Sequence, residues 1–178
     1  MSTQSTRFET RLFGREVSYG LSGPWASYWL VFLRLIMGWW FLAAGLGKIL
    51  EHGVLYDAEG WMLHATDGTI IFPITEWVAM NAVVVPNLLI PWGQLAIGLG
   101  LMLGCLTRLA AANGALLMAF FYFGNAGWEN GFVNGDLMGL LLFLTIIVFA
   151  AGRVWGIDAS LEDTDFVRKR PWLRYLMG

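Results

Sequence analysis

The sequence predicts an all-α membrane protein, a four-transmembrane-helix antiparallel bundle with both termini in the cytoplasm. Three observations predict this fold class. Apolar residues make up 57% of the 178-residue chain. They gather in four blocks that are separated by polar joints, and the basic residues fall on alternate joints. No polar stretch is long enough to form a separate soluble domain.

Each apolar block is expected to form one helix. A bilayer core of about 30 Å requires roughly 20 helical residues, because each residue advances the helix by about 1.5 Å. Three blocks approach or exceed that length. The third is short, and it either includes Thr107 and Arg108 at one end or tilts little. The blocks cover residues 25–50, 88–106, 109–124 and 137–155.

The distribution of basic residues sets the orientation. The joints 51–85 and 125–134 carry acidic residues but no Lys or Arg. Positive charge stays on the cytoplasmic side, so these two joints are predicted to be external. The cytoplasmic basic residues are Arg7, Arg11 and Arg15 before the first block, Arg108 between the second and third, and Arg153, Arg168, Lys169, Arg170 and Arg174 at the end of the chain.

This orientation divides the chain into three parts. Residues 1–24 form a cytoplasmic segment, and the apolar run after them is too long for a signal-peptide core, so it is expected to be a retained anchor helix. Residues 25–158 form the membrane domain, with an external loop at 51–85 whose second half lies on the membrane surface. Residues 159–178 form a basic amphipathic tail, suited to anionic lipid or to a partner protein.

Composition excludes several classes of function. The net charge of −2 gives no reason to expect a nucleic-acid partner. A single cysteine, Cys105, cannot form an intramolecular disulfide, and no Cys or His spacing typical of zinc or iron–sulfur sites is present. His52 and His64 both fall in the external loop, so no His lies in a predicted span, where it could bind haem. Their spacing is not typical of a metal site either, and no metal site and no covalently bound cofactor are predicted.

Small residues indicate how the helices pack, because close backbone approach drives helix association in lipid. Ala96, Gly100 and Gly104 recur at four-residue spacing in the second block, and the third block offers Ala111, Ala115 and Ala119. These two stripes predict a tight hairpin of the second and third helices. Gly38 and Gly45 lie on the face of the first helix that also carries Arg34, Phe41 and Lys48.

Arg34 is the main candidate for a functional residue. It stands nine residues beyond Trp25, roughly 13 Å into the first helix. An arginine at such a depth usually faces the bundle interior or a wet cavity. Asn113 lies on the cytoplasmic side of the third helix and Gln94 on the outer side of the second helix, and both are expected to contact Arg34 in the interior. The alternative is that Arg34 extends back to the inner headgroups and has no chemical role.

A second group of candidates lies at the external ends of the helices. Lys48 and Asp136 bound the first and fourth helices and can form an ion pair, which is usually architectural. Asp136 can alternatively cap its own helix, where the helix dipole stabilises a carboxylate. Trp128, Asn130 and Asn134 belong to the same corner.

The sequence resembles a known family in three places. The runs are Leu33 to Lys48 (LRLIMGWWFLAAGLGK), Gly98 to Ala111 (GLGLMLGCLTRLAA) and Ala151 to Asp158 (AGRVWGID). The first looks like the first-helix signature of the DoxX/DoxD family of small four-helix membrane proteins, and the likeness covers about residues 29–158. Gln94 is a departure, because many relatives have a carboxylate near that position.

The resemblance implies a function in quinone-linked redox chemistry. One branch of the family is similar to the large subunit of thiosulfate:quinone oxidoreductase, which oxidises thiosulfate to tetrathionate and passes the electrons to quinone. Other members look like accessory subunits that hold redox proteins at the membrane. The expected partners are therefore membrane lipid, a diffusible quinone, and a redox subunit or a second copy of the chain. A small transporter is a weaker third reading, because broken helices and inverted repeats are not evident.

Under the hypothesis that the protein is a quinone-linked oxidoreductase, the resemblance assigns roles to eight residues. Arg34 would stabilise a quinone oxygen or the reduced anion, and Lys48 would attract the sulfur oxyanion. The acidic external loop opposes that substrate, since its carboxylates repel an anion. The candidate catalytic residues are Arg34, Gln94 and Lys48, and the candidate quinone-binding or substrate-binding residues are Phe41, Asn113, Trp128, Asn134 and Asp136.

Overall fold

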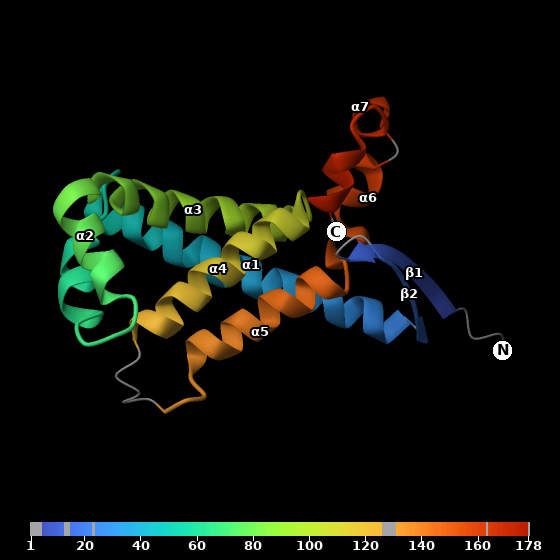
Figure 1. Ribbon diagram of the computed structural model, residues 1–178. Helices are drawn as coiled ribbons and strands as arrows, with labels where there is room; N and C mark the ends of the chain where they lie inside the picture. The colour runs from blue at the N-terminus through green and yellow to red at the C-terminus, as the bar shows by residue number, and fades with distance from the viewer. Residues whose placement is uncertain (1–4, 13–14, 23, 126–130, 163, 178) are drawn as a thin grey trace.

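Four long helices form the body of the protein in the computed structural model (Figure 1). The structure describes residues 5–12, 15–22, 24–125, 131–162 and 164–177. Consecutive long helices run in opposite directions, α1 packs most extensively on α3, and α4 packs most extensively on α5. The helices are α1 (Pro24–His52), α3 (Val84–Leu103), α4 (Thr107–Gly124) and α5 (Gly135–Val148). The predicted helical fold is confirmed for this body.

Two of these helices are long and apolar enough to cross a membrane. They cover Trp25–His52 and Val84–Leu103, and α5 is a shorter apolar helix. The helix of the third block begins at Thr107, which agrees with the first of the two alternatives for this short block. That all four helices cross the membrane, with cytoplasmic termini, stays a prediction.

The core lies where the four helices meet. Met37 and Phe41 of α1 are buried against Leu101 of α3 and Phe143 of α5. The rings of Phe41 and Phe143 pack edge to face with centroids 4.7 Å apart. Such pairs contribute about 0.5–1.5 kcal/mol beyond their buried area.

The closest helix approach is between α1 and α3. A Cβ atom at Gly98 would overlap the backbone of Leu42, and one at Gly45 would lie 2.6 Å from the nitrogen of Leu95. The prediction of a tight α3–α4 hairpin is wrong over most of its length. These helices meet where Gly100 faces Ala110 and then diverge, so that Ala96 lines an open groove.

The fourth block was predicted as one helix to residue 155, and this boundary is wrong. Helix α5 ends at Val148, Ala150 takes the left-handed conformation with φ of 48°, and a short 3-10 turn, η2 (Ala151–Arg153), follows. The chain then forms α6 (Ile157–Leu161), α7 (Asp165–Arg168) and the 3-10 turn η3 (Pro171–Tyr175). The early end of α5 leaves backbone carbonyls in the following segment without helical donors.

The predicted external loop is a folded cap at one end of the bundle. It contains η1, a π-helix (Trp61–Ala65), and α2 (Phe72–Ala82), and Figure 1 places α2 across the end of the long helices. Ala58, Met62 and Ala79 form a small core of its own. The hydroxyl oxygens of Thr66 and Thr75, both buried, lie 2.6 Å apart in a hydrogen bond.

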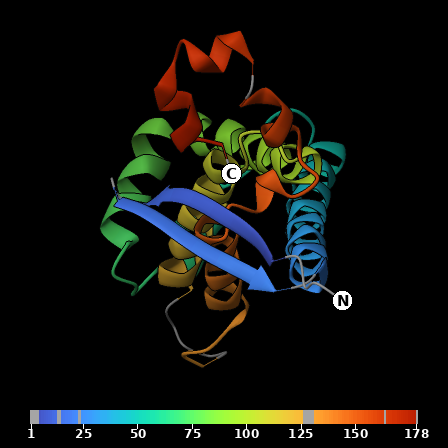
Figure 2. The same ribbon diagram turned by 90° about the vertical axis from the view of Figure 1, so that its right-hand side faces the viewer.

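The N-terminal segment forms a β-hairpin that the helical prediction did not include. Strand β1 (Ser5–Leu12) pairs antiparallel with β2 (Arg15–Ser22), with Ser5 opposite Ser22 and Leu12 opposite Arg15. Figure 2, viewed along the bundle, shows the hairpin crossing the end that also carries the C-terminus. In β2, the alternation of Val17, Tyr19 and Leu21 with other residues is a signal for a strand.

Candidate functional site

Arg34 is buried, as the sequence predicted, with 2% of its surface exposed. Its Nη1 donates to the carbonyl oxygens of Ala151 at 2.9 Å and Val154 at 3.0 Å. Its Nη2 donates to the carbonyl oxygen of Trp155 at 3.2 Å. A continued α5 would have bonded such carbonyls within the helix, so the end of α5 at Val148 makes them free to bind the guanidinium.

The guanidinium of Arg34 fits into its site because two neighbouring residues are glycines without a Cβ atom. A Cβ atom at Gly104 would lie 2.7 Å from Nη1 of Arg34, and a Cβ atom at Gly156 would lie 2.8 Å from it. Gly104 also ends α3 in the left-handed conformation, with φ of 65°, which glycine adopts at little cost. Gly104 therefore serves both the turn and the packing of Arg34.

Asp158 completes this cluster, and the sequence analysis gave it no role. It is fully buried, and its two carboxylate oxygens accept from the backbone nitrogens of Leu106 at 2.7 Å and Thr107 at 2.9 Å. These nitrogens belong to the first turn of α4, where a carboxylate also meets the positive end of the helix dipole. A Cβ atom at Gly152 would lie 2.5 Å from the Asp158 carboxylate. The sequence feature that could have identified Asp158 as a candidate is its position, since it is an acidic residue just after an apolar block.

The three sequence runs that carry the family resemblance thus meet at one place, which we call the Arg34 cluster. It joins the first helix, the α3–α4 turn and the segment after α5. Its members are Arg34, Gly104, Thr107, Gly152, Gly156 and Asp158.

Three residues that were predicted to lie near Arg34 in the interior lie outside the Arg34 cluster. Gln94 is buried on α3 where Gly45 of α1 approaches it, and its Oε1 has no hydrogen-bond partner within the described ranges. Phe41 packs in the core. Asn113 is exposed on α4, where its Nδ2 donates to the carbonyl oxygen of Leu109 at 2.8 Å. The proposed meeting of Arg34 with Gln94 and Asn113 is therefore not formed.

The candidate site residues at the external ends of the helices also do not form one site. Nζ of Lys48 lies 3.4 Å from the carbonyl oxygen of Ala44 and 5.6 Å from the centre of the Tyr56 ring. Asp136 instead accepts from Nδ2 of Asn125 at 3.0 Å, so the predicted Lys48–Asp136 pair is wrong. The cap of α5 is Asn134, whose Oδ1 accepts from the nitrogen of Leu137 at 3.0 Å, and Asp136 sits in the first turn. Trp128 and Asn130 lie outside the described residues.

A groove lies between α3 and α4. Its volume is about 780 Å³, within the range of about 300–1,000 Å³ typical of small-molecule sites. It extends from Trp61 and Thr75 in the cap to Cys105 and Leu106 in the α3–α4 turn. Most of its lining is apolar, and Asn113 contributes an amide from the wall formed by α4.

The groove follows α3 over most of its length. Val85 and Leu103 both line it and lie about 27 Å apart along α3 at about 1.5 Å per residue. A long apolar groove of this kind can accept an extended hydrocarbon chain.

Cys105 is the thiol at the end of this groove. Burial, and then the negative charge of Asp158, raise the pKa of the Cys105 thiol. Its thiolate is therefore scarce at neutral pH, which favours packing over reactivity. No group of three or more His, Cys, Asp or Glu side chains that could hold a metal ion occurs in the part of the chain described.

Comparison with known families agrees with this geometry. The family model described as "TQO small subunit DoxD" matches residues 29–172, which is more than half of the chain and includes all of the Arg34 cluster. The description names the small subunit, so the implied likeness to a large subunit is not confirmed. No curated protein and no solved structure matches the chain.

Proposed function

The chain belongs to the DoxD family, and on that premise we propose that it is a membrane subunit of a thiosulfate:quinone oxidoreductase that holds the quinone acceptor in the α3–α4 groove. The observation that carries the proposal is the groove itself. It is apolar, it runs along most of α3, and it is formed by helices that we place in the membrane.

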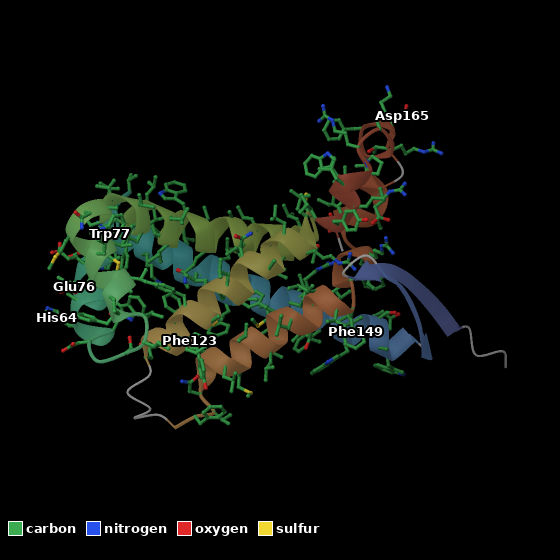
Figure 3. The ribbon with its side chains drawn as sticks, in the orientation of Figure 1. His64, Glu76, Trp77, Phe123, Phe149 and Asp165 are labelled. Atoms are coloured by element: carbon green, nitrogen blue, oxygen red, sulfur yellow. The ribbon has the colours of Figure 1, made fainter. Side chains whose placement is uncertain are left out.

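The outward apolar surface supports a location in the membrane with all four helices crossing it. Trp39 of α1 is 61% exposed, Leu88 of α3 is 46% exposed and Phe123 of α4 is 45% exposed. Soluble monomers rarely expose contiguous apolar patches of more than a few hundred Å². Figure 3 shows such side chains along the outer faces of the long helices. The basic residues then place both termini in the cytoplasm.

Asn113 is the residue that we propose binds the quinone head. It is one of the predicted quinone-binding residues and it lies in the groove. An Asn amide has two N–H donors, and the hydrogen bond to Leu109 uses one of them. The second can donate to a quinone carbonyl oxygen.

The proposed reaction is a two-electron transfer. Two thiosulfate ions join through a new S–S bond to give tetrathionate and release two electrons. Quinone accepts these electrons together with two protons and becomes quinol. In this scheme the chain positions the acceptor, and Lys48, at the outer end of α1, remains a candidate to attract the anion.

Arg34 has a positioning role in this proposal. The cluster around it fixes Gly104, Leu106 and Thr107, and the same turn supplies Cys105 and Leu106 to the inner end of the groove. Gln94 and Phe41 lie behind the wall formed by α3, so direct contact of either with the quinone stays a prediction.

A non-catalytic anchoring subunit is the second candidate. The engagement of Arg34 by three carbonyl oxygens favours it, because this charge was the predicted quinone ligand. An anchoring subunit would bind a redox partner and leave the groove to ordinary lipid.

Purification in mild detergent separates the two candidates. The quinone-binding subunit should retain quinone, and membranes that contain it should reduce a quinone analogue with thiosulfate. A preparation that retains a redox partner but no quinone, from membranes with no thiosulfate-dependent reduction, would support the anchoring subunit and refute the quinone proposal.

A further inference from the structure

The C-terminal segment 165–175 presents a dense positive surface. Arg168, Lys169, Arg170 and Arg174 are all exposed. Exposed aromatic side chains lie among them, including Phe166 at 59% and Trp172 at 57%. We call these six residues the basic-aromatic surface.

This surface belongs to a folded element. Val167 and Met177 are buried, with 1% and 4% of their surfaces exposed. The carbonyl oxygen of Leu176 accepts from the nitrogen of Leu109 at 3.1 Å, which fastens the segment to the first turns of α4. At its base, Arg153 donates to Glu162 in an ion pair of 2.9 Å. The backbone that carries the four cations is therefore anchored to the bundle, and their side chains are free to meet a partner.

The position of the segment suits a membrane surface. Figures 1 and 2 show α6 and α7 beyond the end of α3 and displaced to one side of the long helices. Trp25 and Trp155, at the same end, are 81% and 75% exposed, as expected at the headgroup level. The carboxylate of Asp165 lies at the outer tip of the segment in Figure 3. With the long helices in a bilayer, the segment overhangs the lipid beside the bundle.

We propose that the basic-aromatic surface docks on anionic phospholipid headgroups beside the bundle. The charges are complementary, and each Lys or Arg near an anionic surface strengthens attachment about fivefold. Trp172 and Phe166 can enter the interface between the charges. Leu109 lines the groove as well as holding the segment, so docking also steadies the inner end of the groove. The proposal rests on the membrane placement above but does not depend on quinone.

The test uses the full chain with Cys105→Ala and Thr164→Cys, labelled with a fluorophore at position 164. The protein is placed in nanodiscs of phosphatidylcholine alone or of an equal mixture with phosphatidylglycerol, each with the same trace of a lipid that carries a nitroxide quencher on its headgroup. We expect stronger quenching in the mixture at low salt. The difference should disappear at 1 M salt, where the screening length falls to about 3 Å.

Two variants separate charge from folding. Replacing Arg168, Lys169 and Arg170 together by Gln should weaken attachment about a hundredfold and reduce quenching to the level in phosphatidylcholine. Replacing Arg168 and Arg170 by Lys keeps the charge and should preserve quenching. Equal quenching in both lipids at low salt, or full quenching in the Gln variant, would overturn the proposal. Loss of retained quinone in the same discs would count only against the proposed function.

Discussion

Arg34 carries a permanent charge into the interior of the bundle, and three backbone carbonyl oxygens replace the water it loses. Charge-assisted hydrogen bonds of this kind contribute about 1.5–3 kcal/mol each. The planar guanidinium reaches Ala151, Val154 and Trp155 at once, which a lysine ammonium on its flexible chain cannot match. Arg34 thus joins α1 to the segment after α5.

Replacing Arg34 should destabilise the fold. Arg34→Leu leaves two buried carbonyl oxygens and one partly buried carbonyl oxygen without a donor, and we expect a loss of stability of about 1–3 kcal/mol for each buried acceptor. Arg34→Lys should fall between this variant and the wild type. Arg11→Leu, in the N-terminal hairpin, is the control and should change little. The thermal unfolding midpoint in detergent measures the effect, and equal midpoints for Arg34→Leu and Arg11→Leu would contradict the account.

At the residue scale, the sequence predicted the burial of Arg34 but not its partners. The carbonyl acceptors exist because α5 stops at Val148, and no Pro or Gly marks the left-handed residue, which is Ala150. Glycines near Arg34 were visible in the sequence. Their meeting from three distant runs depends on tertiary packing and was not.

At the scale of elements, Pro91 ties the cap to the bundle. Proline has no N–H, so the carbonyl oxygen of Asn87, four residues earlier in α3, lacks its helical donor. The nitrogen of Tyr56 donates to that oxygen at 3.0 Å. The nitrogen of Ala58 donates to Oδ1 of Asn87 at 2.8 Å. One asparagine therefore holds the start of the cap by two hydrogen bonds.

Replacing Asn87 should loosen the cap without unfolding the bundle. Asn87→Ala leaves the N–H of Ala58 without its acceptor, at a cost of about 1–3 kcal/mol. Asn81→Ala is the matched control, because Nδ2 of Asn81 only donates to its own helix at Trp77. Hydrogen exchange of residues 54–66 should be faster in the first variant alone. Unchanged exchange in Asn87→Ala would refute this role.

Helix positions were predictable because apolar blocks of membrane length leave few alternatives. Helix ends were not, since Gly104 and Ala150 stop helices inside apolar runs. The groove was missed for a related reason. Stripes of small residues predict that two helices can approach, but here α3 uses Gly98 to approach α1 and diverges from α4.

At the scale of the whole molecule, the predicted orientation in the membrane rests on the distribution of charge. The cap, which carries exposed Asp67, lies at one end of the bundle, and the basic C-terminal segment lies at the other (Figure 1). With Cys105→Ala as background, Asp67→Cys should react with an impermeant maleimide from outside intact cells. Thr164→Cys should react only after the cells are opened. The reverse pattern would invert the predicted topology and the side on which substrate binds.

The position of quinone in the α3–α4 groove is the central claim, and two glycines allow a direct test. Gly93 lines the groove and Gly47 does not, and a Cβ atom at either would meet open space, so both tolerate a larger side chain. Quinone retained by the purified protein is the quantity to measure. Gly93→Phe should fill the groove and lower retention at least about tenfold, or about 1.4 kcal/mol, while Gly47→Phe retains the wild-type amount. Equal retention by the two variants would contradict the account.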